Sequence, residues 1–159
     1  GPGAPVAVHL PNSPVIQTGK RDGSKIRLPN GNYLEETASY YVLVETKAGG
    51  MTPALISMKS TQLNVSKKWN SMMKTIQIPD GKGGMAIPPM HGVVYNLQSV
   101  LQKNDKGSWY GWSVTQDRIM GQEDKSLYLT AKDFNSTAAK GNVQTKADVE
   151  EKAKDSTPY

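Results

Sequence analysis

The segment "STQLNVSKKWNSMMKTI", residues 60–76, carries the clearest helix signal in this sequence. Ser60 is a favourable N-cap residue, and Pro79 follows where the pattern stops. Lysines and small polar residues occupy the face opposite the apolar residues. The large apolar side chains recur at helical spacing and share one face: Val65, Trp69, Met72, Met73 and Ile76. We therefore expect one amphipathic helix here, with Trp69 on its buried side.

Three β-rich segments precede this helix, and each is followed by a turn signal or by the helix itself. Tyr, Val, Ile and Leu are frequent in these segments, which is typical of strands. The turns contain Asn-Gly and Gly-Gly pairs, which mark strong chain reversals. The expected strands are residues 24–28, 37–46 and 51–59.

A hairpin and a second helix follow. Residues 93–102 and 108–115 predict two strands around the turn Asn104-Asp105-Lys106-Gly107, and residues 127–139 predict a helix. Three strands, a helix and a two-stranded hairpin is the order of an OB-fold. We expect a mainly β protein with an OB-like small β-barrel and a C-terminal helix, although other small barrels share this order.

The chain divides into three parts by composition. Residues 1–23 are rich in Pro, Gly and Ser, predict a flexible arm, and begin with a Gly-Pro-Gly that resembles a protease-cleavage remnant. Residues 24–139 are expected to form the barrel domain. Residues 140–159 hold four lysines against four acidic residues and almost no large apolar residues, which predicts a disordered tail.

The residues offer little material for catalysis. The chain has no cysteine, which excludes disulfides, thiolate metal sites and thiol nucleophiles. His9 and His91 are far apart, and neither has the carboxylate spacing of a metal site or a catalytic triad. The "GKGG" at residues 81–84 does not complete a phosphate-binding loop. We expect no enzyme activity, no metal and no cofactor.

The same features bear on location. A chain without cysteine fits a reducing compartment. No run of about 18 apolar residues would span a membrane, and no signal peptide is visible. We expect a cytoplasmic protein without membrane contact.

Positive charge is concentrated in one stretch. The chain has a net charge of +5, and residues 59–82 hold five lysines against the single Asp80, a net charge of +4. A local basic patch indicates an anionic partner such as nucleic acid or a lipid surface. The alternative is that a soluble protein simply has a basic side.

The segment "NDKGSWYGWSV", residues 104–114, gathers three aromatic residues after a turn. In a strand, Tyr110 and Trp112 share one face while Trp109 points to the other. We expect Tyr110 and Trp112 in the core, and Trp109 outside beside Gly111, where no side chain blocks a flat ligand. The alternative is that Trp109 only covers the end of the barrel.

Exposed aromatic rings and lysines together favour single-stranded nucleic acid, because bases stack on the rings and cations contact the phosphates. Tyr40 and Tyr41 point to opposite faces, so one of them belongs to the binding side. The helix lysines are solvated by default and contact ligand only if the helix borders the cleft. The candidate binding residues are Trp109, Lys103, Lys106, Lys59, Arg27, Lys47, Tyr40, Tyr41, Lys67 and Lys68.

Two stretches, "LISMKSTQLNVSKKWNSMM" (residues 55–73) and "NDKGSWYGWSV" (residues 104–114), resemble segments of small proteins of tailed bacteriophages. The resemblance spans residues 26–139. It implies a virus-encoded, cytoplasmic OB-fold protein from a replication or recombination gene cluster that coats transient single strands. The charge-balanced tail departs from the acidic tails by which many single-strand binders recruit enzymes.

We therefore expect a non-catalytic single-stranded DNA-binding protein that acts in replication or recombination. RNA is an open alternative as ligand, and homo-oligomers or complexes with replication or recombination proteins are compatible with this function. The competing hypothesis is a protein-interaction module, either a phage factor that binds a host or viral enzyme or a virion component. In that case the aromatic cluster would be core, and the exposed apolar patch would lie in "MAIPPM", residues 85–90.

Overall fold

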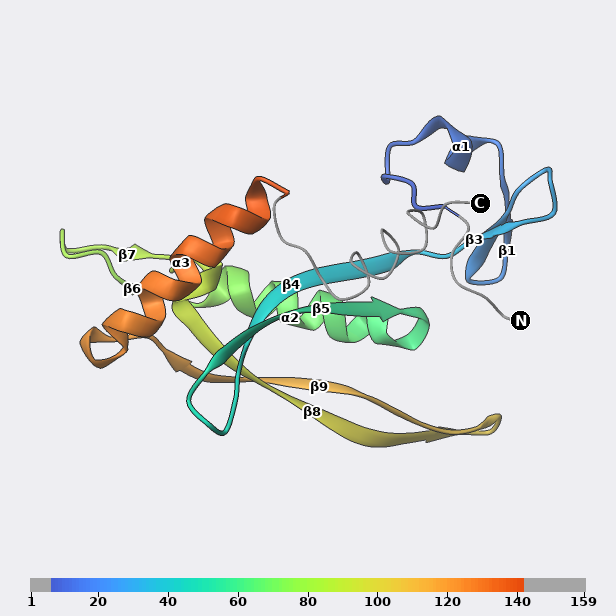
Figure 1. Ribbon diagram of the computed structural model, residues 1–159. Coiled ribbons are helices and arrows are strands. Elements are labelled where there is room, and N and C mark those ends of the chain that lie inside the picture. Colours follow the sequence, from blue (N-terminus) through green and yellow to red (C-terminus); the bar gives the residue numbers. More distant parts are fainter. Residues whose placement is uncertain (1–6, 142–159) are drawn as a thin grey trace, which may run out of the picture.

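The computed structural model describes residues 7–141 (Figure 1). The expected disordered tail therefore lies almost wholly outside the described residues, as do the first six residues of the arm. Most of the regular structure is β, arranged as hairpins around two long helices. In chain order the elements are α1 (Pro14–Gln17), β1 (Lys20–Asp22), β2 (Lys25–Arg27), β3 (Tyr33–Leu34), β4 (Thr37–Glu45), β5 (Met51–Lys59), η1 (Ser60–Gln62), α2 (Leu63–Thr75), β6 (Ile78–Pro79), β7 (Met85–Ala86), η2 (Met90–Gly92), β8 (Val93–Asn104), β9 (Gly107–Ile119), η3 (Gln122–Asp124) and α3 (Lys125–Ala139).

The first strands form a small antiparallel sheet at one end of the molecule (Figure 1). Lys20 pairs with Arg27 across β1 and β2, and Arg27 pairs with Tyr33 across β2 and β3. Gly23, at φ +62°, makes the turn between β1 and β2. The boundary expected between residues 23 and 24 thus falls inside a hairpin, because the arm contributes β1 to this sheet.

Two long hairpins dominate the molecule, and both follow the turn signals in the sequence. β4 and β5 pair from Thr37–Lys59 to Glu45–Met51, and β8 and β9 pair out to Asn104–Gly107. At the tip of the second hairpin, the Asn104 Oδ1 accepts a hydrogen bond from the Lys106 backbone N–H at 2.8 Å. Gly107 adopts φ +139°, a region that favours glycine. The expected strands and the hairpin turn are confirmed.

Helix α2 packs against both hairpins through its apolar face. The Trp69 ring lies 4.4 Å from the Tyr40 ring of β4 and 5.7 Å from the Tyr95 ring of β8, measured between centroids. Trp69 is 4% exposed and Met58 of β5 is fully buried. The predicted helix and the buried position of Trp69 are confirmed.

The hairpins do not close into a barrel within residues 7–141. These residues form four separate sheets, β1-β2-β3, β4-β5, β6-β7 and β8-β9. At the edge of β9, the Trp112 backbone N–H donates to Gln62 Oε1 at 2.7 Å. A side chain thus occupies a donor that a neighbouring strand would otherwise use. The predicted strands and helices occur in the expected order, but α1 and the short strands β1, β3, β6 and β7 were not predicted, and the expected OB-like closure is not seen.

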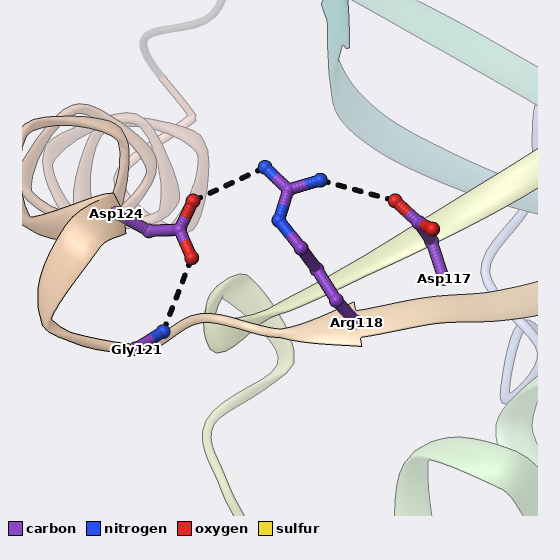
Figure 2. Close-up of polar contacts among 4 residues, drawn as sticks. All are labelled: Asp117, Arg118, Gly121 and Asp124. Atoms are coloured by element: carbon purple, nitrogen blue, oxygen red, sulfur yellow. Dashed lines mark hydrogen bonds and ion pairs between the residues drawn. The ribbon is translucent and has the colours of Figure 1, made fainter.

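Arg118 fixes the corner where β9 turns into α3 (Figure 2). Its guanidinium contacts Asp124 Oδ1 at 3.1 Å and Asp117 Oδ2 at 3.0 Å. Asp124 Oδ2 also accepts a hydrogen bond from the Gly121 N–H at 3.1 Å. The pKa of Asp124 is lowered, mainly by its hydrogen bond with Arg118 and then by the hydrogen bond from the Gly121 N–H. The pKa of Arg118 is raised, mainly by its hydrogen bond with Asp124. The arrangement holds the turn from which α3 starts.

The described residues bury few large side chains. None of the helices between residues 7 and 141 is long and apolar enough to cross a membrane. Exposed apolar side chains occur on the outer faces of both hairpins and on the segment after β6. The buried apolar residues are Leu28, Met58, Trp69, Val93 and Ala131.

Candidate nucleic-acid interface

The two faces of β9 are the reverse of the sequence-based expectation. Tyr110 is 71% exposed and Trp112 is 37% exposed, although both were expected in the core. Trp109, expected outside, is half-buried. Its indole Nε1 is enclosed and has no hydrogen-bond partner among the described residues. The prediction that Trp109 faces outwards while Tyr110 and Trp112 lie in the core was therefore wrong.

Gly111 explains the reversal. It is buried, and a Cβ at this position would collide with the Gln62 side chain and lie 2.9 Å from Gln102 Nε2. Glycine within a strand often marks such a close approach. Because the turn that leads into α2 lies against this face, the bulkier Tyr110 and Trp112 point the other way. The bare Gly111 makes room for Gln62, not for a flat ligand.

Residues 110–112 of β9 share a hollow with Gln62 and the end of β5. Ser57, Lys59, Gln62, Ser99, Tyr110, Gly111 and Trp112 line this hollow, which has a volume of about 270 Å³. Leu55, Ser57 and Lys59 alternate along β5 and so share a face. Tyr41 is the cross-strand partner of Leu55 and points the same way. Ser57 and Lys59 therefore connect the hollow to the exposed face of the first hairpin that carries Leu55 and Tyr41.

We call this surface the outer track, defined by Tyr41, Leu55, Lys59, Tyr110 and Trp112. Tyr41 is 49% exposed and Leu55 is 39% exposed. The Lys59 Nζ lies 3.5 Å from Glu35 Oε2, and the Lys59 side chain is 63% exposed. Such exposed ion pairs contribute little, so Lys59 remains able to exchange Glu35 for a phosphate. The outer track thus combines three exposed aromatic rings with an accessible cation.

A second hollow lies at the tip of the β8–β9 hairpin, and we call it the hairpin-tip hollow. Its volume is about 340 Å³. Lys106 lies in it, whereas Lys103 lies on the outer face of β8, on the same side as Leu101. Both predicted lysines are exposed and flank the same tip. The residues that line the hairpin-tip hollow are Ser60, Thr61, Asn104, Lys106, Gly107, Ser108 and Trp109.

Tyr40 and Tyr41 divide between the faces as alternation requires. Tyr40 points towards α2, where its hydroxyl lies 2.6 Å from Ser66 Oγ and 3.0 Å from Asn70 Oδ1. Tyr41 points outwards on the outer track. Of the two candidates, Tyr40 is therefore a packing residue and Tyr41 is available to ligand.

The remaining predicted cations lie outside both hollows. Arg27 belongs to the N-terminal sheet, with its guanidinium 5.9 Å from the centre of the Tyr33 ring. Lys47 lies in the β4–β5 turn. Lys67 and Lys68 are exposed on α2. The structure does not bring these four side chains to the rings of the outer track.

Three contributors to the site were missed because strand alternation alone does not say which face is inside. Tyr110 and Trp112 were assigned to the core because they share a wholly apolar face with Val114, and Gln62 received no role. The available signal was Gly111, since a glycine between two large aromatic residues indicates that the opposite face meets a neighbouring element.

Other chemistry-bearing groups have structural explanations. Asp80 Oδ1 accepts the backbone N–H groups of Lys82 at 2.7 Å and Gly84 at 3.0 Å, which lowers the pKa of Asp80. Backbone N–H groups of the "GKGG" loop thus donate to the carboxylate of the preceding residue, Asp80. Burial, and then the charge of Lys132, lower the pKa of His91. Within residues 7–141, no three His, Cys, Asp or Glu residues are placed to hold a metal ion.

An exposed apolar segment lies away from both hollows. Met85 is 57% exposed, Ile87 is 56% exposed and Met90 is 65% exposed. This is the patch that the protein-interaction hypothesis expected in "MAIPPM". The same hypothesis expected a buried aromatic cluster, and the exposure of Tyr110 and Trp112 does not fit that part.

Comparison with known proteins gives one match. The family model of the Pam3 phage gp34-like protein matches residues 1–144. Searches of curated proteins and of solved structures found no significant match. The family match confirms the phage origin that the sequence resemblance implied. The chain belongs to the Pam3 phage gp34-like protein family.

Proposed function

We propose that this phage protein binds single-stranded nucleic acid, DNA in the first place, along the outer track and without catalysis. One observation carries the proposal. Tyr110 and Trp112 point outwards from the same face of β9 and share a hollow with Lys59. Open aromatic faces next to a cation are what sequence-independent binding of single strands requires.

The physical chemistry of the outer track suits a strand with splayed bases. Each base stacked on an aromatic ring contributes about 1–3 kcal/mol and does not depend on base identity. Lys59 and Lys103 supply cations for the phosphates, which makes affinity fall with salt. We infer that the protein coats transient strands in the host cytoplasm during replication or recombination.

Two tyrosines provide a matched test, because Tyr41 on the outer track and Tyr33 on the N-terminal sheet are both 49% exposed. Tyr41→Ala should weaken binding of a fluorescein-labelled oligo-dT by about fivefold or more, since it removes one stacking ring. Tyr33→Ala should leave the affinity unchanged. Fluorescence anisotropy at low and high salt measures both. Equal losses in the two variants, or no binding by the unmodified protein at low salt, would contradict the proposal.

The exposed Met85, Ile87 and Met90 favour a second candidate function, docking of a protein partner. Apolar side chains gathered on one exposed segment are typical of protein interfaces. A variant with Ile87→Lys and Met90→Lys separates the two functions. It should bind oligo-dT as the unmodified protein does if the outer track is the binding site. A loss of oligo-dT binding in this variant would instead show that the segment with Ile87 and Met90 contributes to nucleic-acid binding.

A further inference from the structure

The hairpin-tip hollow has the lining of an anion site. Ser60, Thr61 and Ser108 contribute hydroxyl groups, and Lys106 contributes an ammonium group. Asn104 uses its Oδ1 to accept the Lys106 backbone N–H, which leaves its side-chain NH₂ as the free part of the amide. The seven described residues that line the hollow include no acidic residue. Asp105 belongs to the same turn but does not line the hollow. The groups that remain are mostly hydrogen-bond donors around one positive charge.

The hairpin-tip hollow directly adjoins the outer track. Ser60 and Thr61 line the first, whereas their neighbours Lys59 and Gln62 line the second. On β9, Ser108 and Trp109 line the first, and Tyr110 begins the second. Consecutive Cα atoms are about 3.8 Å apart, so the two hollows are neighbours on both walls. The hollow that Lys106 lines is therefore next to the residues that present Tyr110 and Trp112.

From this juxtaposition we propose that the hairpin-tip hollow is the phosphate subsite of the strand held on the outer track. The inference rests on the proposed function and adds a division of labour to it. The rings of the outer track take bases, and Lys106 with the hydroxyls of Ser60, Thr61 and Ser108 takes a phosphodiester group. The half-buried Trp109 forms part of the wall and is not a stacking ring.

Two turn lysines test the subsite, because Lys106 and Lys47 are both exposed and each lies at the turn of a long hairpin. Lys106→Gln should weaken oligo-dT binding by about fivefold at low salt and reduce the slope of log K against log salt by about 0.7, the value for one lost contact with a single strand. Lys47→Gln should change neither quantity. Ser108→Asp, which places a negative charge in the hollow, should weaken binding more than Ser108→Ala.

The nature of the anion is tested with a neutral backbone and with free phosphate. An oligo-dT with methylphosphonate linkages should bind the unmodified protein and the Lys106→Gln variant with equal affinity, since no charged phosphate remains. Inorganic phosphate alone, followed by NMR shifts of the Lys106 and Ser108 amides, should bind far more weakly than the oligonucleotide. Tight binding of inorganic phosphate without an effect of Lys106→Gln on oligo-dT would overturn the subsite.

The binding measurements distinguish failure of the phosphate subsite from failure of the proposed function. If the unmodified protein binds oligo-dT with tryptophan quenching but Lys106→Gln and Lys47→Gln behave alike, only the subsite is wrong. If the unmodified protein does not bind oligo-dT at low salt, both are wrong. Circular dichroism of each variant shows that its fold is retained.

Discussion

Gly111 determines which aromatic side chains of β9 meet solvent. Its α-carbon faces Gln62, which in turn accepts the Trp112 backbone N–H. Any larger residue would push Gln62 away from that bond. The exposed positions of Tyr110 and Trp112, on which the proposed function depends, thus follow from one small residue.

A double-mutant cycle tests this role. Gly111→Ala should lower the free energy of unfolding by about 1–3 kcal/mol, because the new methyl group overpacks the contact and displaces a hydrogen-bonding side chain. In the background of Gln62→Ala the same substitution should cost less, since the nearer obstacle is gone and only the Gln102 side chain, with its Nε2 2.9 Å from the new Cβ, still has to shift. Chemical denaturation of the four proteins measures the coupling. Additive effects would show that Gly111 and Gln62 do not interact in this way.

The sequence predicted which aromatic side chains of β9 share a face, but not which face is buried. Alternation correctly separated Trp109 from Tyr110 and Trp112, because strand geometry is local. It did not identify the inner face, because that depends on where α2 approaches, which no local pattern specifies. Large apolar side chains were taken as core, although folded proteins also expose many of them.

At the scale of elements, α2 is the part that joins the two long hairpins. Its Trp69 packs between Tyr40 of β4 and Tyr95 of β8. The Tyr40 hydroxyl also hydrogen-bonds to Ser66, which is 3% exposed. Hairpin and helix boundaries were predictable because turn residues and helical spacing are properties of short segments of the sequence. Which element packs on each face of a hairpin was not predictable, because contacts between distant segments determine it.

Tyr40→Phe separates packing from binding. The ring remains on Trp69, but the buried Ser66 loses a partner, so the free energy of unfolding should fall by about 1 kcal/mol. Oligo-dT affinity should stay unchanged, because Tyr40 points away from the outer track. Urea unfolding and anisotropy on the same samples check both expectations. A variant of unchanged stability that bound oligo-dT less tightly would place Tyr40 in the interface after all.

At the scale of the whole molecule, the described residues form an open arrangement of hairpins around α2 with few buried apolar side chains (Figure 1). The sequence predicted the order of the longer strands and helices but missed the short strands β1, β3, β6 and β7. It did not predict whether the hairpins close, since closure depends on pairing between strands far apart in the chain. The open arrangement leaves the outer faces of both long hairpins accessible.

The central claim is that Trp112 forms part of a stacking surface for single strands, and its own fluorescence tests this most directly. Trp69 is buried and Trp109 half-buried, whereas Trp112 is 37% exposed. Titration with oligo-dT at low salt should quench the unmodified protein. Trp112→Phe should lose most of the quenching but keep affinity within about threefold, and Trp112→Ala should weaken binding by about fivefold or more. Full quenching in Trp112→Phe, or neither quenching nor binding in the unmodified protein, would contradict the claim.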